Sequence, residues 1–302
     1  MIAAIESYLA LRRTAGFVLI NPQYLLRSFA TFAVDHQEPY IRTATVIDWA
    51  SQAATVAQRH TRYQTVCQFV RYVRLEEPQH ESPPPNHFGY RKTRRVPHIY
   101  SPAEIDRLIL AATQLAPRDT LRPQTYATLI SLLAVTGLRI SEALGLLVSD
   151  ITSNGLLIRK TKFQKSRLVP LHETSSAGLH SYLTQRLRAH PAGDHVFVGR
   201  SGQPLAYRTV YPVFGRLLKS AGVLPSHRHR PRLHDLRHTF AVRALESAPA
   251  GRQRIGQHMV ALATYLGHVN IDATYWYLET TPELLAGIAA AGERFLYEED
   301  QS

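Results

Sequence analysis

The chain has 302 residues, enough for two domains of ordinary size, and its hydrophobic content of 45% excludes wholesale disorder. Lys and Arg outnumber Asp and Glu by 35 to 23, and the net charge of +12 favours a polyanionic partner, nucleic acid before anionic membrane, over a charge that serves solubility alone. The single cysteine, Cys67, excludes an internal disulfide and a cysteine-based zinc site, and the lack of a signal pattern or a long apolar run predicts a cytoplasmic protein.

Residues 1 to about 78 are expected to form four short helices in a small bundle. Apolar residues recur there at three- and four-residue spacing, the period of a helix with one buried face. The expected helices begin near Ile2, Tyr24, Thr43 and Thr61, and the third extends to Gln58. These elements predict a helical domain over residues 1–80.

A linker is predicted over residues 81–98. Residues 81–86 read Glu-Ser-Pro-Pro-Pro-Asn, and prolines that fix φ and lack a donor exclude helix and sheet. Residues 91–95 then add four positive charges. We interpret the segment as a basic, proline-rich interdomain linker, with an ordinary surface loop as the alternative.

A second domain is predicted over residues 99–302. Ser101, Pro102 and Glu104 form a capping box with proline in the first turn, so a helix should run from Pro102 to about Leu115. Two short β-like runs, 156–158 and 167–170, flank a polar tip. The predicted fold class is mainly α with a small antiparallel β-sheet. Further helices are expected at about 123–135, 173–189, 207–221, 234–247, 256–266 and 281–296.

The first stretch that carries candidate chemistry is residues 136–142, Thr-Gly-Leu-Arg-Ile-Ser-Glu. Gly137 is expected to end one helix in a left-handed turn, which places Arg139 at the start of the next helix. An arginine held there between buried neighbours is suited to bind a phosphate. Taken alone, an ordinary surface arginine explains the pattern equally well.

The second stretch lies around His234 and Arg237. The two residues are three apart and share one face of the predicted helix, while Leu233, Leu236 and Phe240 lie toward the core. Residues 207–243 hold eight Lys or Arg and one acidic residue, so the region favours an anionic ligand. A metal site is the competing interpretation, because four histidines gather here: His227, His229, His234 and His238.

The third stretch, residues 265–277, combines a turn with a cluster of aromatic side chains. Gly267 is expected to cap a helix and to leave His268 just beyond its end. Tyr275, Trp276 and Tyr277 close the stretch. Core packing or base stacking would explain any one of these tyrosines.

Together the three stretches resemble the active-site motifs of the tyrosine recombinase (phage integrase) family over roughly residues 98–296. The family pattern is Thr-Gly-(Leu/Met)-Arg-x-Ser-Glu, a Lys on a β-hairpin, His-x-x-Arg, Leu-Gly-His, and a Tyr nine residues after that His. Residues 1–80 resemble, more weakly, the family's SAM-like core-binding domain. In this sequence the motif positions fall on Arg139, Lys162, His234, Arg237, His268 and Tyr277.

Two of these assignments have neighbours of the same type. Lys162 lies five residues before Arg167, where the run Arg-Leu-Val-Pro-Leu is similar to the family's closing strand, but Lys160 remains an alternative. Tyr275 is two residues from Tyr277, and the spacing from His268 favours Tyr277.

The resemblance implies an enzyme that breaks and rejoins DNA without metal, ATP or another cofactor. Tyr277 would be the nucleophile and form a 3′-phosphotyrosyl bond, while Arg139 and Arg237 would stabilise the charge on the phosphate. His268 would donate a hydrogen bond to the same phosphate. His234 is the natural general base, and Lys162 would protonate the departing 5′-hydroxyl.

The resemblance also implies double-stranded DNA as partner, a homotetramer on two DNA sites, and a place on the nucleoid. Residues 279–296 would form a tail helix that docks on its own domain or on a neighbouring subunit. A mobile-element enzyme is weakly favoured, and the alternatives are a type IB topoisomerase-like enzyme or a non-catalytic DNA-binding relative. Candidate contacts to the DNA backbone are Arg91, Lys92, Arg94, Arg95, Arg228, Arg230 and Arg232.

Overall fold

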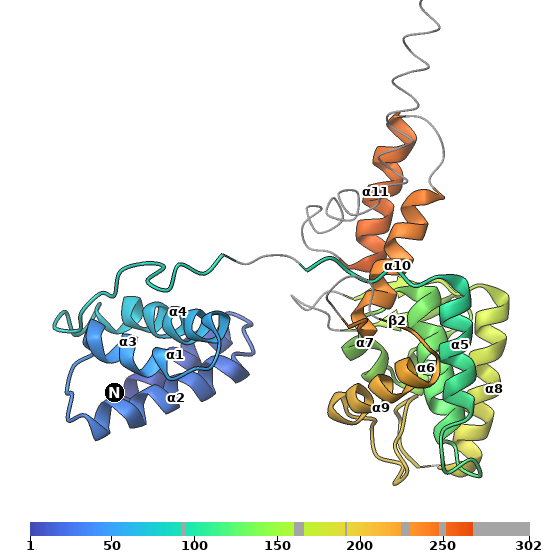
Figure 1. Ribbon diagram of the computed structural model, residues 1–302, viewed down its shortest axis with the longest axis horizontal. Helices are drawn as coiled ribbons and strands as arrows, with labels where there is room; N and C mark the ends of the chain where they lie inside the picture. The colour runs from blue at the N-terminus through green and yellow to red at the C-terminus, as the bar shows by residue number, and fades with distance from the viewer. Residues whose placement is uncertain (92–94, 160–165, 191, 225–229, 248–251, 268–302) are drawn as a thin grey trace, which may run out of the picture. The chain divides into compact units, whose positions relative to one another are not determined.

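The computed structural model describes residues 1–91, 95–159, 166–190, 192–224, 230–247 and 252–267. The chain divides into two compact units, Met1–Arg95 and Val96–Ser302. Each unit has a hydrophobic core of its own (Figure 1). Among the described residues, no helix is long and apolar enough to cross a membrane.

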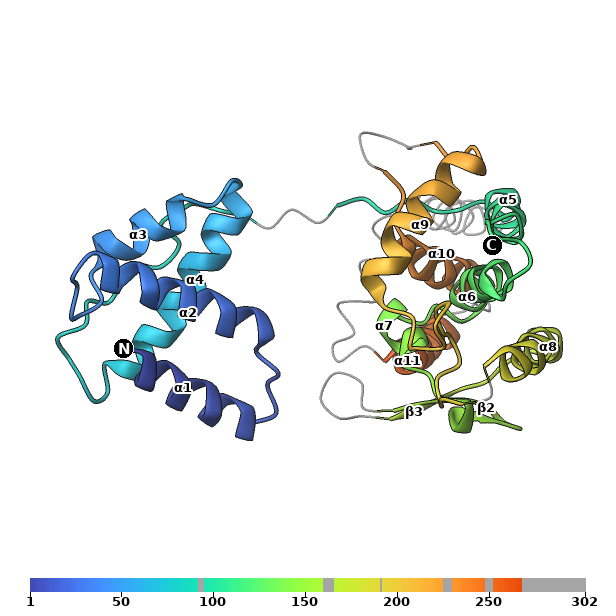
Figure 2. The ribbon, with the colours of Figure 1, turned by 90° about the horizontal axis from the view of Figure 1, so that it is seen from below.

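The first unit is a bundle of four helices. Figure 2 shows how these helices are arranged, and aromatic side chains fill the core between them. Phe29, Trp49, Tyr63 and Phe69 are almost completely buried, and Phe29 meets Trp49 edge to face. Burial of such large apolar side chains supplies the main stabilising free energy of a small domain. The helices are α1 (Ile2–Thr14), α2 (Ile20–Asp35), α3 (Thr43–Ser51) and α4 (Val56–Val73).

The prediction of one helix from Thr43 to Gln58 is wrong. Helix α3 ends at Ser51, and α4 begins at Val56. Thr55 is the N-cap of α4: its hydroxyl accepts a hydrogen bond from the Gln58 backbone, and the Gln58 side chain accepts one from the Thr55 backbone. This reciprocal capping box starts a new helix at a point where the apolar periodicity alone continues without interruption.

The proline-rich segment packs against the first unit over its first part. The Glu81 carboxylate accepts a hydrogen bond from the backbone of Thr43 at 2.7 Å, and the Tyr63 hydroxyl donates one to the carbonyl of Pro84 at 2.7 Å. Phe88 meets the Tyr63 ring edge to face. The boundary between the two units falls later, at Arg95–Val96, inside the predicted linker.

The second unit is built on α5 (Pro102–Thr113), α6 (Arg122–Thr136) and α8 (Glu173–Ala189), which lie side by side (Figure 1). The predicted capping box of Ser101 and Glu104 is confirmed, with both hydrogen bonds formed. The remaining elements are α7 (Ile140–Leu144), the 3-10 helix η1 (Val148–Asp150), α9 (Tyr207–Ser220), α10 (Leu233–Glu246) and α11 (Arg252–Leu266). The helix expected at 281–296 lies outside the described residues.

A three-stranded antiparallel sheet in the order β1-β2-β3 completes the unit and confirms the predicted fold class. The strands are β1 (Ile151–Thr152), β2 (Gly155–Ile158) and β3 (Arg167–Val169). Ile158 pairs with Arg167, so residues 159–166 form the connection between β2 and β3. Strand β1 was not predicted, because two residues are too few to show an alternating pattern. Figure 2 shows the sheet at one side of the unit, and β3 contacts α11.

Candidate active site

The turn between α6 and α7 places Arg139 at the start of a helix. Gly137 follows α6 in the left-handed conformation, with a φ of 59°. Arg139 is the N-cap of α7, and its backbone N–H donates to Oε2 of Glu142 at 3.0 Å. Ala143 and Leu144 are buried behind it. The predicted glycine turn and the position of Arg139 are therefore confirmed, while its role in catalysis stays a prediction.

Arg237 and His234 both belong to α10 but differ in depth. Arg237 is only 2% exposed, whereas His234 reaches the surface. The Arg237 guanidinium donates from Nη1 to the carbonyl of Gly137 at 2.8 Å and from Nη2 to the carbonyl of Leu266 at 2.7 Å. Arg237 thus joins the C-terminal ends of α6 and α11, and the residue spacing in this helix did not predict that it would be buried.

The end of α11 is the point at which the two arginines meet. Gly267 follows this helix with a φ of 66°, as predicted. Arg139 donates from Nη2 to the carbonyl of Gly267 at 3.1 Å and approaches the carbonyl of Leu266 at 3.5 Å. The carbonyl of Leu266 is therefore shared by Arg139 and Arg237, which lie almost a hundred positions apart in the sequence. The negative end of a helix dipole holds both cations.

This arrangement holds two guanidinium groups close together in fixed orientations. The Arg139 side chain remains 31% exposed, so an external group can reach it. Backbone carbonyls anchor both arginines without neutralising their full charges. Such a pair is suited to an anionic group with several oxygens, such as a phosphate, because each guanidinium can bind two oxygens in a fork.

A cluster of charged side chains that was not predicted from sequence lies beside Arg139. Glu142, with a side chain only 8% exposed, bonds Nη1 of Arg139 at 2.8 Å and Nη2 of Arg167 at 2.8 Å. Burial alone would raise the pKa of Glu142, but hydrogen bonds from Arg167 and Arg139, together with the positive charges, lower it to about 2. Glu142 is therefore ionised at neutral pH, and its ion pair with Arg139 holds that guanidinium in place.

The position of His234 favours a neutral imidazole. Its pKa is lowered, first because surrounding protein atoms displace water from the partly exposed ring, and second because Arg237 and Arg232 are positively charged. Asp235 opposes this shift only in part. A neutral imidazole at neutral pH can accept a proton, as the predicted role of general base requires.

We expect the imidazole of His234 to titrate below pH 6.5, the ordinary value for histidine. The active base is the neutral form, so a lowered pKa extends the pH range of that form toward acid. A histidine NMR titration of the free protein, assigned with His234→Gln, measures the midpoint. Arg232→Gln removes a positive charge and should move the midpoint upward. A midpoint at or above 6.5 in the unmodified protein would contradict this account.

Three predicted residues, Lys162, His268 and Tyr277, lie outside the described part of the chain, as do the alternatives Lys160 and Tyr275. The neighbouring described residues still locate their attachment points. Lys162 belongs to the connection between Ile158 and Arg167, and His268 directly follows Gly267. Of these described neighbours, Arg167 bonds Glu142, and the carbonyl of Gly267 accepts a hydrogen bond from Arg139.

The predicted DNA-contact residues that the structure describes are Arg91, Arg95, Arg230 and Arg232, whereas Lys92, Arg94 and Arg228 lie outside. Arg232 forms an ion pair with the buried Asp235 at 2.8 Å and stands at the N-cap of α10. The guanidinium of Arg230 lies against Gly215 on α9, where a Cβ atom would come within 2.2 Å of Nη2. Arg91 and Arg230 are exposed.

Within the described residues, no group of three or more His, Cys, Asp or Glu side chains is arranged to hold a metal ion. Of the histidines behind the metal interpretation, His234 and His238 are described, and their rings meet edge to face at 4.7 Å. His227 and His229 lie outside.

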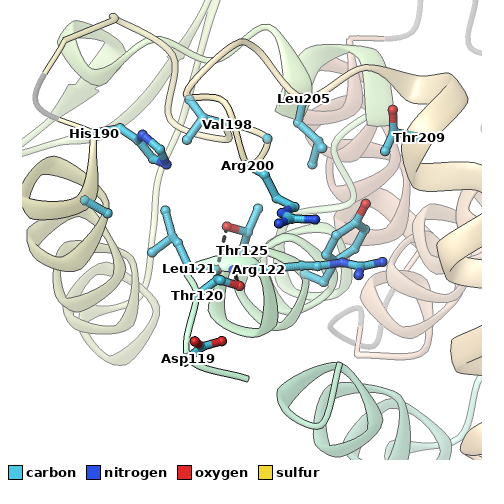
Figure 3. Close-up of a pocket in the computed structure, with 13 residues that line it drawn as sticks. Asp119, Thr120, Leu121, Arg122, Thr125, His190, Val198, Arg200, Leu205 and Thr209 are labelled. Atoms are coloured by element: carbon cyan, nitrogen blue, oxygen red, sulfur yellow. Dashed lines mark hydrogen bonds between the residues drawn. The ribbon is translucent and has the colours of Figure 1, made fainter. Parts of the chain in front are cut away.

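A pocket of about 590 Å³ lies at the start of α6, with Arg122, His190 and Arg200 among its lining residues (Figure 3). Arg122 donates from Nη1 to the carbonyl of Ala116. Arg139, His234 and Arg237 are not among the described residues that line this pocket. The candidate active site is therefore separate from it.

Substitution Gly137→Ala is expected to destabilise the second unit by about 2–5 kcal/mol. A Cβ atom at this position would lie 2.6 Å from Cδ1 of Phe240, whose ring is stacked on Tyr265 and has little room to move. Gly222→Ala is the matched control, because Gly222 has a φ of 61° but no atom within 4 Å of the added Cβ. Urea unfolding measures both variants, and equal losses would show that backbone strain alone decides the effect.

Comparison with known proteins finds similar sequences and structures among integrases and recombinases. Residues 100–283 match the sequence model of the Phage integrase family. The chain is 36% identical over 293 residues to y4rB of Sinorhizobium fredii (strain NBRC 101917 / NGR234), named as an integrase/recombinase, with 93% of each protein covered.

Two solved structures share the fold at lower identity. The Tn1549 transposon integrase in complex with transposon right end DNA is 17% identical, with a TM-score of 0.64 over 95% of this chain and 98% of that one. A lambda integrase tetramer bound to a Holliday junction is 18% identical, with a TM-score of 0.63 over 91% of this chain and 76% of that one.

Proposed function

Because this chain belongs to the phage integrase family, we propose that it is a site-specific tyrosine recombinase that cleaves and rejoins DNA through a 3′-phosphotyrosyl intermediate on Tyr277. The observation that carries the proposal is the convergence of Arg139 and Arg237 on the carbonyl of Leu266. That carbonyl belongs to the residue before Gly267, and the chain continues from there to His268 and Tyr277. The phosphate-binding groups and the nucleophile are thus joined by a short segment.

The two arginines stabilise the charge that develops on the scissile phosphate. As an oxygen attacks phosphorus, negative charge shifts onto the non-bridging oxygens, and cations fixed at those positions lower the barrier. Arg237 is held by two carbonyls and Arg139 by two carbonyls and a carboxylate. Little reorganisation is needed when the phosphate binds, which is the condition under which such charges are most effective.

The reaction proceeds by two transesterifications. The Tyr277 oxygen attacks phosphorus, the bond to the 5′ oxygen breaks, and the 3′ phosphate becomes attached to tyrosine. His234 accepts the phenol proton, Lys162 protonates the departing 5′ oxygen, and His268 donates a hydrogen bond to the phosphate. Attack by a 5′-hydroxyl from another strand reverses these steps and rejoins the DNA. The phosphotyrosyl bond conserves the bond energy, so the residues assigned here require no metal, nucleotide or other cofactor.

We assign a separate role to each of three segments of the chain. Residues 1–80 form the core-binding DNA-binding domain, 81–98 the basic linker, and 99–302 the catalytic domain with its tail. The partner is double-stranded DNA of the nucleoid, in the cytoplasm, and four copies act on two DNA sites. The similar lambda integrase tetramer bound to a Holliday junction supports an assembly of four copies. The exposed Arg91 and Arg230 support contacts to the DNA backbone.

The identity of the target separates this function from its alternatives. DNA that stays bound to the protein after denaturation, recovered from expressing cells without cross-linker, should come from discrete sequences. Two differently marked duplexes that carry a recovered sequence should then exchange strands in the presence of purified protein. Relaxation of supercoils without exchange would indicate a topoisomerase-like enzyme. Binding without any covalent complex would indicate an accessory DNA-binding protein. Recovery from the ends of a mobile element would support the transposition or integration task.

A further inference from the structure

Arg167 connects three elements of the candidate active site, although none of the six predicted catalytic positions falls on it. Its Nη1 and Nη2 atoms donate to the two carboxylate oxygens of Glu142 at 3.1 and 2.8 Å, and its Nε donates to the carbonyl of Tyr265 at 2.7 Å. The side chain is 11% exposed. All five donors of a guanidinium are fixed in one plane, so these three bonds define its orientation.

Arg167 also stands at one end of the connection between β2 and β3, the segment that carries Lys162. Arg167 is the first residue of β3 and pairs with Ile158, the last residue of β2. The base of the connection 159–166 is therefore tied by one side chain to α7, through Glu142, and to the end of α11, through Tyr265. A shift of the hairpin relative to the arginine pair would have to break these bonds.

The charges around Glu142 show why a second arginine is needed. Glu142 carries one negative charge, and it is ionised because it is bonded to Arg139 and Arg167. The three side chains together carry a net charge of +1. Without Arg167, Glu142 and Arg139 would form a neutral pair, and the carboxylate would compete with a bound phosphate for the Arg139 guanidinium.

We propose that Arg167 is a positioning residue for strand cleavage, which balances the charge of Glu142 so that Arg139 remains available to the scissile phosphate. The proposal rests on the function proposed above. Arg167 itself need not touch DNA, since its donors are engaged by Glu142 and Tyr265.

The test measures single-turnover formation of the covalent protein–DNA complex at saturating protein. Arg167→Gln is expected to slow this step by roughly 10- to 100-fold. This effect is smaller than that of removing a donor that itself contacts the phosphate. Noncovalent DNA affinity should change by no more than about threefold, because the contact with DNA is indirect. Arg167→Lys keeps the charge and should recover part of the rate, since one ammonium cannot bond Glu142 and Tyr265 in the same way.

The decisive comparison repeats the substitution in the background Glu142→Gln. With no carboxylate to attract Arg139, loss of Arg167 should then cost at most about threefold, so the two substitutions are not additive. Arg107→Gln is the matched control. Arg107 also donates from Nε to a backbone carbonyl, that of Ala221 at 2.9 Å, and within the described part of the chain it forms no hydrogen bond or ion pair with Arg139, Glu142 or Arg237. It should cleave at the unmodified rate.

Each outcome bears on one of the two proposals. An Arg167→Gln rate equal to that of Arg107→Gln overturns the role of Arg167 while cleavage by the unmodified protein still supports the recombinase function. An equal slowdown with and without Glu142 also overturns it, because Arg167 would then act through stability or through the hairpin alone. If the unmodified protein forms no covalent complex, the recombinase function fails, and the inference fails with it.

Discussion

Tyr277→Phe is expected to abolish the covalent protein–DNA complex, with a fall in rate of more than roughly a thousandfold. The substitution removes one oxygen and leaves the aromatic ring, so it is the smallest change that deletes the proposed nucleophile. That oxygen is the proposed nucleophile, and water cannot form a phosphotyrosyl bond in its place. Noncovalent DNA binding, measured by a mobility shift, should remain within about threefold of the unmodified protein, because phosphate contacts supply most of that affinity.

Tyr275→Phe is the matched control for this prediction. It removes the same atom from a residue two positions earlier, in the same aromatic run. Normal complex formation by this variant, with none by Tyr277→Phe, would agree with the spacing from His268. The reverse result would show that Tyr275 is the nucleophile. Complex formation by both variants would show that Tyr277 is not required as the nucleophile.

Arg237→Gln is expected to have the second-largest effect, with cleavage slowed on the order of 10²- to 10³-fold. The substitution removes a proposed phosphate ligand and also the cross-link between the carbonyls of Gly137 and Leu266. These carbonyls end α6 and α11, and a buried carbonyl that loses its partner costs about 1–3 kcal/mol. The variant should therefore lose stability as well as activity. Cleavage rates and urea unfolding measured on the same preparation separate the two effects.

Arg237→Lys keeps the positive charge and provides the comparison for Arg237→Gln. A single ammonium cannot bond both carbonyls and a phosphate with the geometry of a guanidinium, so we expect recovery of part of the stability and little of the rate. Cleavage at the unmodified rate by the lysine variant would show that Arg237 serves only as a structural cross-link.

The local features of the site were predictable from sequence, because they depend on residues a few positions apart. Gly137 and Gly267 were expected to end helices in left-handed turns, and both have positive φ. Arg139 was expected at a helix start, where the structure has it. Each prediction rests on a short-range signal, the inability of other residues to adopt this conformation without strain.

The tertiary features were not predictable in the same way. The burial of Arg237 depends on the meeting of α6, α10 and α11, and the Arg167–Glu142 ion pair joins residues 25 positions apart, on different elements. No periodicity reports such a contact. The break between α3 and α4 is a different case. Thr55 and Gln58 form a capping box that can be read from the sequence, but the helix was predicted from apolar periodicity alone.

The covalent role of Tyr277 is tested by identifying the amino acid that becomes attached to DNA. Purified protein is incubated with a duplex that carries a recovered target sequence and a nick that traps the cleaved strand. The complex is then digested with protease and nuclease, and the nucleotide-bearing peptide is sequenced by mass spectrometry. We expect a nucleotide linked through its 3′ phosphate to Tyr277, with a free 5′-hydroxyl on the other DNA end. Attachment to another residue, attachment through a 5′ phosphate, or no peptide at all would contradict it.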